Sequence, residues 1–130
     1  MVGIVIVSHS KKIAEGICEM AEQVADKKLK IVAAGGIADG GIGTDAIRIS
    51  EAIVEAEEGD GVVILADLGS AILSSTMALE LLDEAAGVTV RIADAPIVEG
   101  AISAAVQASV GSGIDEVVAV AEAARTISKV

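Results

Sequence analysis

The chain has 130 residues, of which 53% are hydrophobic and none is aromatic, and its formal net charge is −11. This length suits one domain with one core, spanning residues 1–130. The negative charge argues against a basic patch for nucleic acid or an anionic membrane, and any protein partner is expected to offer a basic face. The lack of aromatic residues also removes the stacking platforms of single-stranded nucleic acid binders.

The compartment is predicted from cysteine usage and from the absence of apolar spans. The single cysteine, Cys18, allows no disulfide within the chain, which fits a reducing cytosol. No apolar run approaches the roughly 20 residues of a membrane span. The first residues also lack the pattern of a signal peptide. We therefore expect a cytoplasmic protein, with Cys18 as a packed thiol in a helix and not a nucleophile.

The first predicted elements are a strand and a helix. The β-branched run Gly3–Val7 predicts a strand buried on both faces. The following segment has apolar residues at helical spacing, which predict the inward face of a helix. These apolar positions are Ile13, Ile17, Met20, Ala21 and Val24.

A second strand is predicted at Lys30–Ala34, and a loop with five glycines in nine positions follows at Gly35–Gly43. Thr44 or Asp45 can cap the next helix, which is expected to run to about Glu58. The inner face of this helix is predicted at Ala46, Ile49 and Ile53.

The alternation of strand and helix continues to the end of the chain. The remaining elements are a strand at Val62–Ala66, a helix at Ser70–Leu82, a strand at Val88–Ala93, and helices at Val98–Val110 and Asp115–Ser128. Four alternations predict an α/β three-layer sandwich with a mainly parallel, four-stranded sheet. The strand order and the presence of a fifth strand stay open.

Three polar or glycine-rich segments follow the predicted strands. They are Ser8–Ser10, Gly35–Thr44 and Asp67–Ser70. Ligands of open parallel sheets bind outside the carboxyl ends of the strands, near the point where the strand order reverses. We therefore expect these three segments to meet at one edge of the sheet.

His9 is the only histidine, and it directly follows the first buried strand. Histidine titrates near neutrality, and its neutral ring nitrogen is a good nucleophile. A single histidine cannot form the multi-histidine site that catalytic zinc prefers. The position therefore favours a nucleophile or general base over a metal ligand, beside the alternative of a histidine without chemical function.

Asp67 has two interpretations. An aspartate at the end of a strand often caps the following helix, and Ser70 competes for that role. In the functional interpretation, Asp67 accepts a hydrogen bond from one imidazole N–H of His9. That contact would fix the tautomer and leave the other ring nitrogen free to attack.

The glycine-rich loop matches neither common nucleotide-binding motif. It lacks the Gly-Lys-Ser/Thr ending of a P-loop, and no Gly-x-Gly-x-x-Gly opens a helix after the first strand. It is either a flexible turn or a backbone that offers N–H groups to an anion, with help from the helix that begins near Thr44. The three segments contain no Lys or Arg, so a phosphoryl group there would be held by amides, hydroxyls and helix dipoles.

Four segments together resemble a known family. They are Gly3–Ser10, Ala34–Thr44, Asp67–Ala71 and Ala95–Ala101. The chain resembles the phosphotransfer subunit of the phosphoenolpyruvate-dependent dihydroxyacetone kinase. The domain of that subunit is related to the mannose-type IIA domains of the bacterial sugar phosphotransferase system. The resemblance extends over most of the chain and favours the dihydroxyacetone branch.

The resemblance implies a carrier function and a set of partners. His9 would accept a phosphoryl group from the histidine phosphocarrier protein and pass it to ADP held on the nucleotide-binding subunit of the kinase. Asp67 would orient the imidazole. By motif position, the phosphoryl oxygens would be cradled by Gly36, Thr44, Gly69 and Ser70. The resemblance further implies a homodimer that needs no metal or other cofactor.

Three alternatives stay open. A mannose-type sugar IIA domain would use the same chemistry but pass the group to a sugar-specific IIB domain. A tetrapyrrole metal chelatase also opens with a strand and a Ser/His segment, although a second histidine is missing here. In a receiver-like module Asp67 would react, but receivers need clustered acids where this chain has Ser8–Ser10.

Overall fold

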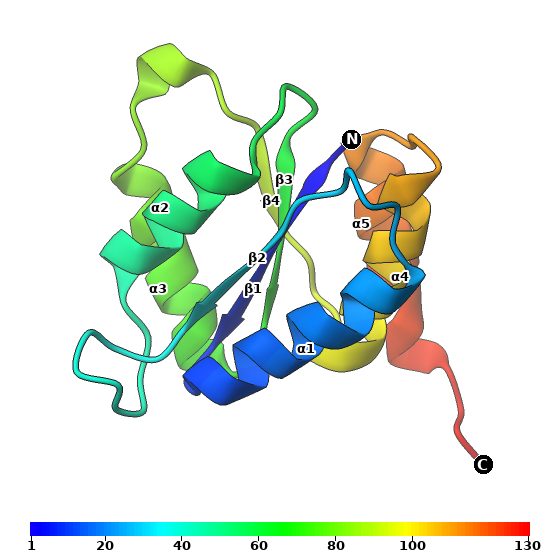
Figure 1. Ribbon diagram of the computed structural model, residues 1–130, viewed down its shortest axis with the longest axis horizontal. Coiled ribbons are helices and arrows are strands. Elements are labelled where there is room, and N and C mark those ends of the chain that lie inside the picture. Colours follow the sequence, from blue (N-terminus) through cyan, green and yellow to red (C-terminus); the bar gives the residue numbers. More distant parts are fainter.

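The computed structural model describes residues 1–130 as a parallel sheet covered by helices on both faces (Figure 1). The sheet has the order β2-β1-β3-β4, and every neighbouring pair is parallel. Its strands are β1 (Gly3–Ser8), β2 (Ile31–Gly35), β3 (Val62–Ala66) and β4 (Val90–Ile92). The predicted three-layer α/β fold with four parallel strands is confirmed, and no fifth strand is present.

The helices form two layers. One face of the sheet carries α1 (Lys11–Val24), α4 (Ile97–Ser109) and α5 (Ile114–Ala123), and the other carries α2 (Ala46–Ala56) and α3 (Gly69–Glu80) (Figure 1). Short 3-10 turns lie at Glu84–Ala86 and Ala124–Thr126. No helix has the length and apolar character needed to cross a lipid bilayer.

Two aliphatic clusters, one on each face, form the core. The cluster under α1, α4 and α5 has 17 buried residues, and the cluster under α2 and α3 has 12. β1 contributes to both, because Ile4 and Ile6 face the first cluster while Val5 and Val7 face the second. This explains why β1 has no polar side chain from Gly3 to Val7 and lies in the middle of the sheet.

The buried face of α1 differs from the prediction. Ile17 and Ala21 are buried as predicted, but Ile13, Met20 and Val24 are about half-exposed. The face that packs on the sheet instead consists of Ala14, Ile17, Cys18 and Ala21. Small residues on this face let the helix axis approach the sheet closely, and the larger aliphatic side chains then lie at its flank.

Cys18 is a packed thiol, as predicted. Its side chain belongs to the cluster under α1, and burial raises the pKa of the thiol to about 12, with further contributions from Glu22 and Glu15. A thiol with so high a pKa carries little thiolate at neutral pH and is a poor nucleophile.

Several predicted boundaries shift. β4 covers only Val90–Ile92, because this edge strand pairs with β3 at three positions alone. The last helix ends at Ala123 and not at Ser128, since a 3-10 turn follows and the Arg125 guanidinium bonds Asp94 and the Glu122 carbonyl. The cap of α2 is Asp45, whose carboxylate accepts from the N–H groups of the first turn.

Candidate functional site

The candidate site lies where β1 and β3 end side by side. These strands are paired so that Val7 stands opposite Ala66, and the N–H of Asp67 donates to the carbonyl of Val7 at 3.1 Å. The residues that follow the two strands, His9 and Asp67, are therefore close neighbours. The reversal of strand order between β2-β1 and β3 falls at the same point, where open sheets bind ligands.

The His9 imidazole is held by the Asp67 carboxylate. Nδ1 of His9 lies 2.9 Å from Oδ1 of Asp67, and the backbone N–H of His9 donates to Oδ2 at 3.0 Å. Both side chains are mostly buried, with 20% and 16% of their surface exposed. Because an ionised carboxylate only accepts hydrogen bonds, Nδ1 donates to Asp67, and in the neutral form of the ring Nε2 then keeps its lone pair.

The Asp67 carboxylate is kept ionised by its donors. Burial on its own raises the pKa of Asp67, but hydrogen bonds from the His9 backbone and ring, the Ser8 hydroxyl and the Leu68 amide together lower it below the ordinary value. Leu68 N–H donates to Oδ1 at 2.8 Å. The site therefore holds a fixed negative charge against Nδ1 of His9.

Ser70 occupies the other side of the imidazole. Its hydroxyl lies 2.6 Å from Nε2 of His9, and it donates to Nε2 in the neutral tautomer that carries its proton on Nδ1. α3 begins at Gly69 and has no side-chain cap, and the residue at its N-cap is Leu68. The capping interpretation of Asp67 and Ser70 is therefore wrong, because both side chains bond His9 instead.

Ser8 is a member of the site that the sequence pattern did not indicate. Its side chain is fully buried, its hydroxyl donates to Oδ2 of Asp67 at 2.9 Å, and it accepts from the Ser10 N–H at 3.1 Å. The sequence places Ser8 in the polar segment Ser8–Ser10 that follows the predicted strand, but the pattern gives its hydroxyl no role. The available signal was a hydroxyl where the run Ile4–Val7 predicts another aliphatic side chain.

The glycine-rich loop is fastened to the histidine segment through its backbone. Gly43 N–H donates to the His9 carbonyl at 2.8 Å, and Gly36 N–H donates to the Ser8 carbonyl at 3.1 Å. Gly36 has a φ of +72°, a left-handed conformation that favours glycine. The amide of Gly36 is thus engaged in holding the loop.

Gly69 and Thr44, which were also expected to hold the phosphoryl oxygens, differ in their position relative to His9. Gly69 is the first residue of α3 and directly precedes Ser70, and a side chain at Gly69 would meet open space. The Thr44 hydroxyl bonds the hydroxyl of Ser74 on α3 at 2.6 Å and makes no hydrogen bond to His9. The first N–H groups of a helix have no partner within it, so Gly69 and Ser70 can offer them to an anion.

A shallow depression of about 430 Å³ adjoins the site. It is bounded on one side by Asp67, Leu68 and Ile72, and on the other by the segment from Ile92 to Ala95. The structure contains no group of three or more His, Cys, Asp and Glu side chains with the arrangement of a metal site. The depression borders Asp67, the carboxylate that holds the His9 imidazole.

The sequence match identifies the class of domain to which this parallel sheet belongs. The family model EIIA-man, described as the PTS system fructose IIA component, matches residues 3–118, and the chain belongs to this family. Similar curated proteins narrow the family further, because they are phosphoryl donor subunits of dihydroxyacetone kinases. The expected resemblance is confirmed.

Two relatives show the extent of the similarity. The phosphoryl donor subunit DhaM of a PEP-dependent dihydroxyacetone kinase from Listeria innocua is 46% identical over 85% of this chain and 88% of its own length. The corresponding subunit from Klebsiella michiganensis is 45% identical over 91% of this chain. The chain spans about a quarter (26%) of that longer protein.

Solved structures share the fold. A crystal structure of a protein of unknown function has 41% identity and a TM-score of 0.83, with 95% of both chains covered. The phosphotransferase component EIIA from Streptococcus agalactiae is 16% identical, with a TM-score of 0.67 over 98% of this chain and 97% of its own. The second likeness supports the fold alone.

Proposed function

We propose that this chain is the phosphoryl carrier of a PEP-dependent dihydroxyacetone kinase and that His9 carries the group. His9 accepts the phosphoryl group from the histidine phosphocarrier protein and passes it to ADP bound on the nucleotide-binding subunit. The names of the relatives support this choice of system. The observation that carries the choice of residue is the 2.9 Å contact that fixes Nδ1 of His9 on Asp67.

The geometry suits attack by Nε2. The Nε2 lone pair forms a bond to phosphorus while the bond between phosphorus and the donor's phosphohistidine nitrogen breaks. Positive charge develops on the His9 ring, and the ionised Asp67 carboxylate stabilises it while the proton stays on Nδ1. In the second transfer, an oxygen of the ADP β-phosphate attacks phosphorus and the electron pair of the P–N bond returns to Nε2.

Ser70 must change partner during this cycle. Its hydroxyl lies on Nε2 in the free protein, at 2.6 Å, where the phosphoryl group would be attached. Rotation about its side-chain bond lets the same hydroxyl donate to a phosphoryl oxygen. The N-terminus of α3 at Gly69 adds N–H groups and a favourable dipole. Gly36 and Thr44 remain proposed members of the cradle.

The partners and the location follow from the proposed reaction. Because His9 lies at the edge of the sheet beside a shallow depression, two proteins can meet it in turn. A surface with a net charge of −11 favours partners with basic faces. The proposed donor and acceptor place the reaction in the cytoplasm, and the family resemblance also implies a homodimer.

A mass assay tests the carrier function. The protein is incubated with phosphoenolpyruvate and the general phosphotransferase proteins, and a gain of one acid-labile, base-stable phosphoryl group is expected. His9→Ala abolishes the gain. If the unmodified protein gains nothing, or if His9→Ala still gains the group, the proposal is wrong.

A second stage separates the dihydroxyacetone system from a sugar system. The phosphorylated protein is mixed with the ADP-loaded nucleotide subunit of a dihydroxyacetone kinase, and formation of ATP is measured. A mannose-type IIB domain serves as the alternative acceptor. Transfer to IIB without ATP formation would assign the chain to the sugar branch.

A further inference from the structure

Thr44 and Ser74 form a hydrogen-bonded pair of hydroxyl groups next to the candidate site. Thr44 directly follows the glycine-rich loop, Ser74 lies on α3, and their hydroxyl oxygens are 2.6 Å apart. Neither hydroxyl makes another hydrogen bond in the structure. Each hydroxyl carries one proton, and the single bond between the two uses only one of these protons. One O–H group of the pair is therefore free to donate to a further acceptor.

The pair lies on the side of α3 that faces His9. Ser70 and Ser74 are four positions apart on this helix, so they share one face, with about 5–6 Å between their Cβ atoms. The Ser70 hydroxyl contacts Nε2 of His9 at 2.6 Å. Side chains of a helix lean toward its N-terminus, so Ser74 leans toward Ser70. Thr44 is thereby about one helical turn away from the nitrogen that would carry the phosphoryl group.

The backbone on both sides of Thr44 is fixed. The N–H of Gly43 donates to the His9 carbonyl at 2.8 Å, and the Asp45 carboxylate accepts from the first turn of α2. Within the segment Gly35–Thr44, the Thr44 hydroxyl is the one side-chain group that forms a hydrogen bond outside the segment. The position of this hydroxyl relative to His9 is therefore set by contacts to three different elements.

A phosphoryl group at this edge of the sheet needs hydrogen-bond donors. The N–H groups of Gly36 and Gly43 are already bonded to backbone carbonyls, and the three segments at the strand ends contain no Lys or Arg. An anionic group is held best where several donors converge on its oxygens. The free proton of the Thr44–Ser74 pair is therefore a donor that the site would otherwise lack.

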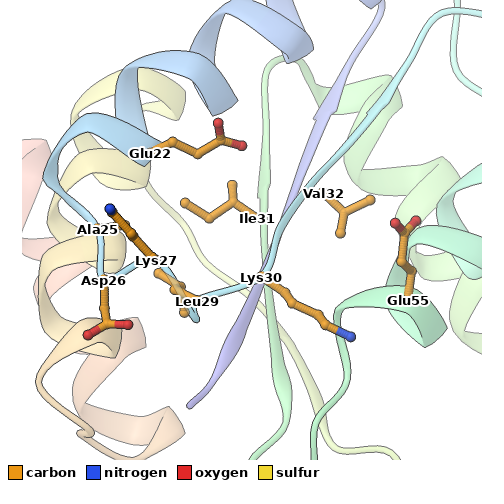
Figure 2. Close-up of a pocket in the computed structure, with 9 residues that line it drawn as sticks. All are labelled: Glu22, Ala25, Asp26, Lys27, Leu29, Lys30, Ile31, Val32 and Glu55. Carbon is orange, nitrogen blue, oxygen red and sulfur yellow. The ribbon is translucent and has the colours of Figure 1, made fainter.

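The groove along β2 suits an anion less well. It has a volume of about 440 Å³ and contains two cations, Lys27 and Lys30, of which Lys30 is already ion-paired at 3.4 Å (Figure 2). Acidic side chains outnumber these lysines in the groove, namely Glu22, Asp26 and Glu55. The groove also lies at the amino end of β2, whereas the candidate site lies at the carboxyl ends of the strands. It therefore does not compete with that site for a phosphoryl group.

We propose that Ser74 is a positioning residue for the phosphoryl group on His9 and that it acts by orienting Thr44. Ser74 donates its proton to the Thr44 oxygen, and Thr44 donates its own proton to a phosphoryl oxygen. This inference rests on the proposed function, which includes Thr44 in the cradle by motif position and gives Ser74 no part. Both hydroxyls keep their protons, so the pair stabilises negative charge without adding or removing a proton. The anionic group favours this order, because bonds in a chain polarise one another.

Rates of phosphoryl transfer in two variants test the order of the donors. Thr44→Val removes the last donor and should slow transfer to His9 at least about tenfold. Ser74→Ala leaves the Thr44 hydroxyl free to rotate among three staggered positions, so transfer should slow about threefold. KM for the donor protein should change less than about twofold in both, because the hydroxyls act on the transferred group. Ser75→Ala, whose hydroxyl bonds the Ala71 carbonyl, is the matched control and should keep the unmodified rate.

A double variant tests whether Ser74 acts through Thr44. T44V/S74A should transfer no more slowly than Thr44→Val, because the orienting group has nothing left to orient. Thr44→Ser keeps the hydroxyl and should restore most of the rate. The phosphorus NMR signal of the phosphohistidine should shift in Thr44→Val and Ser74→Ala but not in Ser75→Ala.

Three outcomes would overturn the inference while His9 still gains the phosphoryl group. The first is an unchanged rate in Thr44→Val and Ser74→Ala. The second is a Ser74→Ala effect that persists in full beside Thr44→Val, since Ser74 would then contact the group itself. The third is a lower melting temperature of both variants with no change in rate or phosphorus signal, which would show that the pair serves the fold alone. An unmodified protein that gains no phosphoryl group contradicts the proposed function, and this inference with it.

Discussion

At the scale of single residues, the site depends on the charge of one carboxylate. Asp67 receives four hydrogen bonds, from the His9 backbone, the His9 ring, the Ser8 hydroxyl and the Leu68 amide. Their combined effect is a lowered pKa despite burial. The carboxylate therefore anchors the ring, and it would be the counter-charge of the imidazole in the proposed phosphoryl transfer.

Replacing Asp67 by Asn should separate these roles. Asp67→Asn keeps the shape but removes the charge, so phosphoryl transfer to His9 should slow at least about a hundredfold. We expect a smaller effect on folding. Rapid-quench kinetics measure the transfer and thermal unfolding measures the stability. Equal losses of rate and melting temperature would favour a purely structural role.

The same variant should change the pH dependence of stability. Because the folded pKa of Asp67 lies below its ordinary value of 3.8, its stabilising contribution is present above the unfolded pKa and is lost as the pH falls through the folded pKa. Over this acid range the unmodified protein should lose more stability than Asp67→Asn. Melting temperatures at steps between about pH 5 and pH 2 would show the difference.

Ser8 should influence the reaction through Asp67. In Ser8→Ala, Oδ2 of Asp67 loses one donor and the Ser10 N–H loses its acceptor, so transfer to His9 should slow about tenfold. Ser75→Ala is a matched control, because Ser75 is also fully buried but bonds the Ala71 carbonyl.

Both serine variants should lose about 1–2 kcal/mol of stability, yet only Ser8→Ala should change the rate. Nitrogen NMR of the His9 ring should also show a changed tautomer ratio in that variant alone. Ser8→Thr, which keeps the hydroxyl, should restore much of the rate. Identical kinetics of Ser8→Ala and Ser75→Ala would refute a positioning role.

At the scale of elements, the alternation of strands and helices was predictable, because buried parallel strands are apolar throughout and helices are periodic. The buried face of α1 was not, since hydrophobicity alone assigns Ile13 and Met20 inward. The buried face of α1 is decided by how closely the axis of this helix approaches the sheet. The proximity of His9 and Asp67 was predictable from the strand ends. The segment Ser8–Ser10 was also expected there, but the contact of the Ser8 hydroxyl with Asp67 was not predictable, because it depends on how the end of β1 is paired with β3.

Gly35 is the residue that permits this close approach. A Cβ at Gly35 would lie 2.6 Å from the Ser10 carbonyl oxygen and 2.8 Å from the Ala14 Cβ, so α1 would have to move. Gly35→Ala should therefore destabilise the fold by about 1–3 kcal/mol. Gly16→Ala, in open space on α1, should instead stabilise it by about 0.5–1 kcal/mol. Urea unfolding measures the stability of both variants. A Gly35→Ala variant that is as stable as the unmodified protein would contradict this packing.

At the scale of the whole molecule, the net charge of −11 affects how a partner reaches the site at the edge of the sheet. An acidic surface attracts a basic partner over several ångströms and speeds the encounter, and dissolved salt screens this attraction. The proposed chemical step at His9 would depend on local charges, because the carboxylate of Asp67 lies in direct contact with the ring. Salt should therefore slow the encounter and leave the stability of the phosphohistidine unchanged.

Transfer kinetics at several salt concentrations test this separation. At low protein concentration, raising potassium chloride from about 20 mM to about 500 mM should slow phosphoryl transfer to His9 about tenfold or more. Spontaneous hydrolysis of the isolated phosphorylated protein, which needs no partner, is the control and should be constant. A transfer rate that does not respond to salt would show that the acidic surface does not guide the donor, and that its charge serves solubility instead.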